Sequence, residues 1–137
     1  IDEFLGNGYT KEEMKMIEES QKILGHAFGA TATTVRVPVR YAHSVSANVE
    51  TEEAFDLDEL AGILANAPGV VLMNDNETND YPTPLFAAGK NETYVGRLRR
   101  DDSVENGMNL WIVADNVRKG AALNAVQIAE LVERKFG

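Results

Sequence analysis

Four side chains in the first third of this 137-residue sequence have the chemistry to bind a small anion and move a proton. Arg36 is followed seven residues later by His43, and Glu12 stands three residues before Lys15. A guanidinium can bind a carboxylate through two hydrogen bonds, an ammonium offers a compact charge suited to phosphate, and a histidine can transfer a proton near neutral pH. Together these side chains could hold a small dianion.

The same four residues also have an ordinary structural interpretation. Glu12 and Lys15 could form an exposed helix pair that contributes about a few tenths of a kcal/mol. Arg36 could be a surface residue of a strand, and His43 could be a histidine whose ring is satisfied by its neighbours. The spacing alone leaves both interpretations open.

Composition excludes several kinds of partner and site. The chain has 13 lysine and arginine residues against 22 aspartate and glutamate residues, a net charge of −9, which argues against a nucleic-acid partner. It has no cysteine, so it supplies no thiol nucleophile, and with two histidines we predict no metal site. Because we find no apolar run of roughly 20 residues and no signal-peptide pattern, we expect a cytoplasmic protein with no membrane partner.

A predicted helix carries the first two of these residues. Thr10 and Glu13 match a capping box, in which each side chain accepts a hydrogen bond from the other residue's backbone N–H. We therefore predict a helix over 11–24. At 100° per residue, Glu12 and Lys15 lie roughly opposite its apolar stripe, which makes them neighbours on the open face.

Two alternating stretches carry the arginine and the histidine. Valines at every second position predict a strand over 33–40, with Arg36 on the face away from the valines. Pro38 lacks a backbone donor, so this strand is predicted to lie at an edge or beside a bulge. His43 opens the second alternating stretch, which we predict as a strand through residue 49.

The rest of the chain alternates strands and helices in one continuous unit. We predict a loop over 74–84 and further strands over three runs: 70–73, 94–99 and 110–114. The last run is uniformly apolar and is therefore predicted to be buried on both faces. Helices are predicted from Leu57 to a point before Pro68, and over 119–136.

Four separated segments carry a family resemblance: GYTKEEMKM (8–16), TTVRVPVRYAHSVSANVE (33–50), PTPLFAAGKNETYVGRLRRD (82–101) and DNVRKGAALNAVQIAE (115–130). They resemble the C-terminal part of bacterial aspartate-β-semialdehyde dehydrogenases, and they occur in that family's order. The second segment holds the most specific pattern, in which Arg36 precedes the run Ala42-His43-Ser44. The resemblance extends through nearly the whole chain.

The resemblance implies an NADPH-dependent reduction of β-aspartyl phosphate to aspartate semialdehyde, on the route to lysine, threonine and methionine. In that family a cysteine thiolate attacks the acyl phosphate, phosphate leaves, and hydride from NADPH reduces the resulting thioester. A histidine activates the thiol and protonates the developing oxygen. The family's cysteine, a nearby glutamine and the glycine-rich cofactor domain precede the part that resembles this chain, so we expect the isolated chain to be inactive.

The resemblance also assigns roles by position. His43 matches the acid/base histidine, and Arg36 matches the arginine that binds the substrate's α-carboxylate. Glu12 matches a glutamate that contacts the substrate at its amino group, and Lys15 matches the lysine at the phosphate position. Asn116 matches a residue at the nicotinamide-cofactor (NADP) site.

The fold and partners follow from the resemblance in the same way. It implies an α+β fold over 1–137, with a mixed, mainly antiparallel sheet packed by helices, as in the C-terminal catalytic and dimerisation domain of glyceraldehyde-3-phosphate-dehydrogenase-like enzymes. It implies a homodimer, and it places the C-terminal helix within 115–137 against an NADP-binding domain outside this chain.

A non-catalytic dimerisation or anion-binding module of the same fold is the alternative. A reductase of acetylglutamyl phosphate is a further one, although its histidine neighbourhood differs from Ala42-His43-Ser44.

Overall fold

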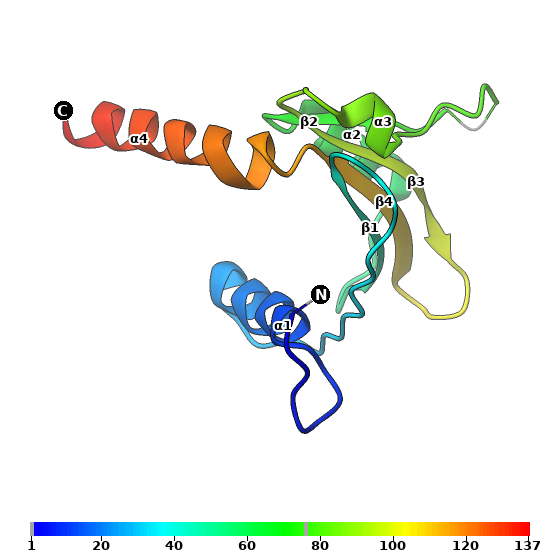
Figure 1. Ribbon diagram of the computed structural model, residues 1–137. Helices are drawn as coiled ribbons and strands as arrows, with labels where there is room; N and C mark the ends of the chain where they lie inside the picture. The colour runs from blue at the N-terminus through cyan, green and yellow to red at the C-terminus, as the bar shows by residue number, and fades with distance from the viewer. Residues whose placement is uncertain (1, 76) are drawn as a thin grey trace. The chain divides into compact units, whose positions relative to one another are not determined.

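The chain divides into two compact units. The computed structural model describes residues 2–75 and 77–137. The first unit is Ile1–Pro38 and the second is Val39–Gly137, and each has its own internal packing (Figure 1). The first unit is organised around a helix and the second around a sheet.

Helix α1, Lys11–Leu24, has the bounds that the sequence predicts. Both halves of the predicted capping box are formed. The Glu13 N–H donates to the Thr10 hydroxyl at 3.2 Å, and the Thr10 N–H donates to the Glu13 carboxylate at 2.8 Å. Thr10 is 1% exposed, so the cap is shielded from water.

Replacing Thr10 with alanine is expected to lower the free energy of unfolding by about 1 kcal/mol, because the first turn of α1 loses its capping oxygen. Thr10→Ser keeps that oxygen and is expected to stay close to the parent. Chemical denaturation followed by circular dichroism compares the two variants. An equal loss in both would assign the effect to the threonine methyl group instead of the cap.

The predicted strand over 33–40 is wrong. All of these residues are described, and none of them belongs to a strand. The Thr34 N–H donates to the Glu13 carboxylate at 2.7 Å, not to a neighbouring strand, and Pro38 has no N–H to donate. Val35 and Val37 are 73% and 51% exposed, so the valines lack the buried face that their alternation predicts.

The second unit contains a four-stranded sheet in the order β1-β4-β3-β2. β4 pairs antiparallel with both β1 and β3, and β2 pairs parallel with β3. The predicted mixed, mainly antiparallel sheet of an α+β fold is therefore confirmed, and each of its strands contains a predicted strand, with β3 and β4 longer than predicted. The strands are β1 His43–Glu50, β2 Val70–Met73, β3 Thr93–Asp101 and β4 Gly107–Ala114.

Two helices pack on this sheet (Figure 1). Helix α2, Leu57–Asn66, confirms the predicted helix and contacts β2 and β3. Helix α3, Pro84–Ala87, contacts β4 and begins at the end of the predicted loop 74–84, in which residue 76 lies outside the described residues. The sequence did not predict α3 because its proline favoured a loop, yet proline fits the first turn of a helix, where its missing N–H has no helical partner to lose.

Helix α4, Leu123–Phe136, begins four residues later than predicted. The preceding segment, Arg118–Ala122, is kinked, with φ of 94° at Gly120. Figure 1 shows α4 extending away from the sheet of its unit. Its large apolar side chains are exposed: Val126, Ile128, Leu131, Val132 and Phe136.

One hydrophobic cluster of the second unit lies on one face of the sheet. Tyr94 of β3 and Val113 of β4 are buried together with Ala42 and with Ala87 of α3. Trp111 packs against this cluster and donates its ring N–H to the Pro82 carbonyl at 2.9 Å. These contacts hold the strand ends that carry the predicted site residues of this unit.

The other face of β1 and β4 is incompletely covered. Val45 and Val49 of β1 are 41% and 39% exposed. Ile112 pairs with Val45 across the strands, shares its face and is half-buried. The prediction that 110–114 is buried on both faces is therefore wrong for this chain, because the described helices leave part of the apolar face open.

Gly96 in β3 allows the chain after β2 to lie close against the sheet. A methyl group on Gly96 would stand 2.3 Å from the Met73 carbonyl oxygen and 2.6 Å from Pro82 Cδ. We expect Gly96→Ala to lower the free energy of unfolding by about 1–3 kcal/mol, because the backbone must shift to relieve this overlap.

Gly62→Ala provides the matched control for this substitution. Gly62 lies in α2, and nothing stands within 4 Å of its added methyl group. Alanine in a helix is expected to raise the free energy of unfolding by about 0.5–1 kcal/mol. Denaturation of the two variants should therefore shift in opposite directions, and a shift of the same sign in both would contradict the close approach at Gly96.

Candidate functional site

Glu12, Lys15 and Arg36 come together in the first unit. Glu12 and Lys15 lie one turn apart on the exposed side of α1, as the sequence predicts. With Arg36 they line an open hollow of about 550 Å³. The other lining residues are Asp2, Met16 and Glu19.

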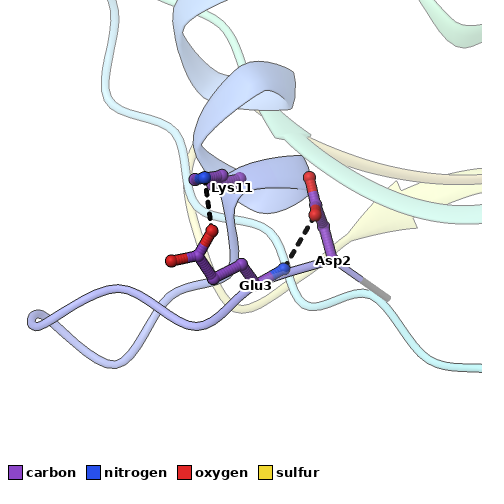
Figure 2. A network of polar contacts seen from close by, with 3 residues as sticks. All are labelled: Asp2, Glu3 and Lys11. Atoms are coloured by element: carbon purple, nitrogen blue, oxygen red, sulfur yellow. Dashed lines mark hydrogen bonds and ion pairs between the residues drawn. The ribbon is translucent and has the colours of Figure 1, made fainter.

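The segment before α1 is tied to the start of the helix, as Figure 2 shows. Glu3 forms an ion pair with Lys11, and the Lys11 N–H donates to the Glu3 carbonyl at 2.9 Å. The Glu3 N–H donates to the Asp2 carboxylate at 2.8 Å. An exposed ion pair contributes little by itself. With the backbone bond, however, these contacts fix the segment that brings Asp2 to the hollow.

The segment that carries Arg36 is held against α1 by Glu13. Glu13 Oε1 accepts the Thr34 N–H at 2.7 Å, and Oε2 accepts the Thr10 N–H. The hydrogen bonds from the backbone of Thr10 and then of Thr34 lower the pKa of the Glu13 carboxyl. Sequence analysis found Glu13 as a capping residue, but its link to Thr34 joins segments 21 residues apart and has no local signal.

The hollow presents charges of both signs. Lys15 and Arg36 supply two cations, while Glu12, Asp2 and Glu19 supply carboxylates around them. A guanidinium and an ammonium suit a carboxylate and a phosphate, and a carboxylate suits a protonated amine. The lining can therefore pair with anionic groups and with an amino group of a small molecule.

His43 is the first residue of β1 and pairs with Ala114 at the end of β4. Its side chain is exposed and so can reach a reacting molecule. Ala42 before it has φ of 74°, a left-handed conformation that residues with a Cβ rarely adopt, and it is 4% exposed. This buried, strained residue sets the direction in which the chain enters β1. Its conformation was missed, although the sequence analysis includes Ala42 in the family pattern.

Asn116 lies in the turn that follows β4, at the same end of the sheet as His43, and is half-buried. The buried Asp115 orders this turn, because its carboxylate accepts the Gly89 N–H at 2.7 Å and the Val117 N–H at 3.0 Å. Burial opposes the ionised form, but these bonds, first of all the one from Gly89, lower the pKa of Asp115. Sequence analysis missed Asp115, whose signal is an acidic residue directly after an apolar strand.

The structure therefore presents the predicted site residues in two groups, one in each unit. The first unit holds Glu12, Lys15 and Arg36 around its hollow. The second holds His43 and Asn116 at one end of the sheet.

Within residues 2–75 and 77–137, no cluster of three or more histidine or carboxylate side chains is placed to hold a metal ion. Over the same residues, no helix is long and apolar enough to span a membrane.

The sequence matches a known family over most of its length. A model of the semialdehyde dehydrogenase dimerisation domain matches residues 1–119. The aspartate-semialdehyde dehydrogenase of Aquifex aeolicus is 48% identical over 136 residues, which are 98% of this chain and 40% of that protein. The enzyme of Shewanella violacea is 49% identical over 138 residues, 99% of this chain and 40% of that protein. The chain therefore spans about two fifths of the length of these curated relatives.

Solved structures show the same fold. Aspartate semialdehyde dehydrogenase II from Vibrio cholerae, complexed with ASA, superposes with a TM-score of 0.95 at 48% identity, covering 100% of this chain and 40% of that one. A probable aspartate-semialdehyde dehydrogenase from Pseudomonas aeruginosa gives a TM-score of 0.90 at 35% identity, covering 100% of this chain and 41% of that one. The agreement extends over the whole of this chain.

Proposed function

Because the chain belongs to the semialdehyde dehydrogenase dimerisation-domain family, we propose that the full-length protein reduces β-aspartyl phosphate to aspartate semialdehyde, with NADPH as the reductant. The family predicted from four sequence segments is confirmed. We propose that residues 1–137 supply the substrate-binding groups and the acid/base histidine of this reaction, while the nucleophilic cysteine and most of the cofactor site lie elsewhere in the full-length protein.

The hollow that collects Arg36, Lys15 and Glu12 is the observation that carries this proposal. Arg36 binds the α-carboxylate of the substrate, Lys15 binds the phosphate, and Glu12 accepts a hydrogen bond from the amino group. The Vibrio cholerae relative is described as complexed with ASA, which we take as aspartate semialdehyde. That molecule carries the carboxylate and the amine that the hollow suits.

His43 acts as the acid and the base of the proposed reaction. It accepts the proton of the cysteine thiol, so that the sulfur attacks the acyl carbon, the carbon–oxygen bond to phosphate breaks and phosphate leaves. NADPH, when bound, supplies the hydride that reduces the thioester. His43 then returns its proton to the negatively charged acyl oxygen, which gives a hemithioacetal. When His43 takes that hydroxyl proton back, the carbon–sulfur bond breaks, aspartate semialdehyde leaves and the cysteine sulfur recovers the proton. The His43 ring is exposed at the start of β1, so it is accessible for these proton transfers.

Asn116 is proposed to contact the nicotinamide end of the cofactor. Its amide can donate and accept hydrogen bonds, as a carboxamide partner requires. The turn ordered by Asp115 fixes its backbone at the same end of the sheet as His43. The sequence holds no glycine-rich phosphate loop, so most of the cofactor is proposed to bind to another domain. The exposed apolar side chains of α4 are proposed to pack against that domain.

A second copy of the chain is the proposed partner of the open sheet face. Val45 and Val49 leave apolar surface exposed on β1, and Ile112 of β4 extends it. An exposed apolar patch on a sheet favours association, and the family is described as a dimerisation domain. We therefore propose a homodimer that buries this face.

The proposal is tested by assaying the full-length protein with aspartate semialdehyde, phosphate and either NADP or NAD, and by following reduced cofactor through its absorbance. We expect phosphate-dependent turnover that favours NADP, and none from residues 1–137 alone. A folded, full-length protein that reduces neither cofactor would overturn the proposal. Dimer formation without turnover would instead support a non-catalytic dimerisation module.

A further inference from the structure

We propose that Glu13 is a positioning residue, whose buried carboxylate fixes Arg36 relative to Glu12 and Lys15 and thereby sets the affinity of the hollow for the substrate's carboxylate. This inference rests on the proposed function of the hollow. It concerns a residue that does not line the hollow itself and acts only through the segment it holds.

Glu12 and Glu13 are neighbours on α1 with opposite surroundings. Glu12 is exposed and lines the hollow, whereas Glu13 is 7% exposed. Both oxygens of Glu13 are engaged: Oε2 accepts the Thr10 N–H at 2.8 Å, and Oε1 accepts the Thr34 N–H at 2.7 Å. One side chain therefore joins the first turn of α1 to the segment that returns towards Arg36.

The bond at Thr34 is the attachment nearest to Arg36 in the described part of this segment. Two earlier attachments hold it further from the hollow: the Gln21 amide donates to the Phe28 carbonyl at 2.7 Å, and the hydroxyl of Thr31 lies 2.9 Å from that of Tyr9. Between Thr34 and Arg36 stands Val35, which is 73% exposed and adds little packing. Without the bond at Thr34, Arg36 would sit on a segment free to adopt many backbone conformations.

The charge on Glu13 is what lets it hold both N–H groups. A carboxylate offers two acceptor oxygens, and hydrogen bonds to an ionised acceptor are stronger than those between neutral groups. Glutamine keeps one acceptor and places an NH₂ group where the second should be, opposite a backbone N–H. Glutamine also serves in capping boxes, so Glu13→Gln can retain the bond to Thr10 and lose the one to Thr34.

In the full-length protein, Glu13→Gln is expected to raise the KM for aspartate semialdehyde by about 10- to 100-fold, with a smaller change in kcat and an unchanged KM for NADP. Hydrogen exchange at the Thr34 amide should become faster in the same variant. Unchanged KM for aspartate semialdehyde, or equal rises in both KM values, would overturn the inference.

Two matched variants separate positioning from charge and from stability. Glu18→Gln removes an exposed carboxylate of α1 outside the hollow and should leave both KM values unchanged. Thr10→Ala should lower the melting temperature, but it keeps the backbone N–H and the Glu13–Thr34 bond, so KM should again be unchanged. If Thr10→Ala raised KM as much as Glu13→Gln does, loss of stability would explain both and the inference would fail.

A double-mutant cycle with Arg36→Lys tests whether Glu13 acts through Arg36. We expect Glu13→Gln to add less than about a 2-fold rise in KM in the Arg36→Lys background, because the guanidinium it positions is already gone. If Glu13→Gln raised KM by the same factor in both backgrounds, Glu13 would not act through Arg36 and the inference would fail, while the proposed function would remain intact. If Arg36→Lys alone left KM unchanged, the proposed function of the hollow would itself fail.

Discussion

His43→Asn in the full-length protein is expected to lower kcat by about 10²- to 10⁴-fold, the range that a positioned general acid/base contributes. Asparagine can still form hydrogen bonds, but it cannot accept the thiol proton or return it to the acyl oxygen. The KM for aspartate semialdehyde should change much less, because the proposed binding groups lie on α1 and at Arg36. Steady-state rates with aspartate semialdehyde, phosphate and NADP provide the measurement.

His26→Asn is the matched control, because it removes the chain's other histidine. His26 follows α1, is exposed and lies outside the hollow, so its replacement should leave kcat and KM close to the parent values. Equal kcat in the two variants would contradict the assignment of His43.

Elements specified by neighbouring residues could be predicted from the sequence. The Thr10–Glu13 capping box and the apolar stripe after it predicted the bounds of α1, and the alternation from His43 predicted β1. Both signals act within a few residues, where backbone and side-chain preferences are local. The placement of Glu12, Lys15 and the start of β1 followed from these signals alone.

Features that depend on distant partners could not be predicted in the same way. Alternation over 33–40 indicates extended backbone, but a strand also needs a neighbouring strand, and the Thr34 N–H instead binds the Glu13 carboxylate. That link, and not strand periodicity, holds the segment of Arg36. The observed start of α4 likewise differs from the predicted start, because Gly120 adopts a left-handed conformation. A glycine permits this conformation but does not require it, so the sequence does not predict it.

The burial predicted for the apolar run of β4 differs from the burial observed in this chain. Uniformly apolar residues predict burial on both faces, yet Ile112 is only half-buried because the face it shares with Val45 stays open in this chain. The prediction fits better as a property of the proposed dimer, in which a second copy supplies the missing cover. An apolar pattern favours burial, but it does not say whether the cover comes from the same chain or from a second one.

Arg36→Ala in the full-length protein is expected to raise the KM for aspartate semialdehyde by about 100-fold, because two hydrogen bonds to a charged carboxylate are lost together. Arg36→Lys keeps the charge but not the planar pair of donors, and should raise KM by about 10-fold. In both variants kcat should fall less than in His43→Asn, since the proposed contact of Arg36 is to the part of the substrate that does not react. Initial-rate kinetics over a range of aspartate semialdehyde concentrations separate the two constants.

Arg40→Ala supplies the control for loss of an exposed arginine that lies four residues along the chain from Arg36 and does not line the hollow, and its KM should stay near that of the parent. Added guanidinium ion should partly restore the KM of Arg36→Ala and have no such effect on Arg40→Ala, because it replaces only the missing group. Equal rises in KM for Arg36→Ala and Arg40→Ala would mean that the general charge of the protein attracts the substrate. A rise confined to Arg36, graded from lysine to alanine and reversed by guanidinium, requires a carboxylate held at that side chain.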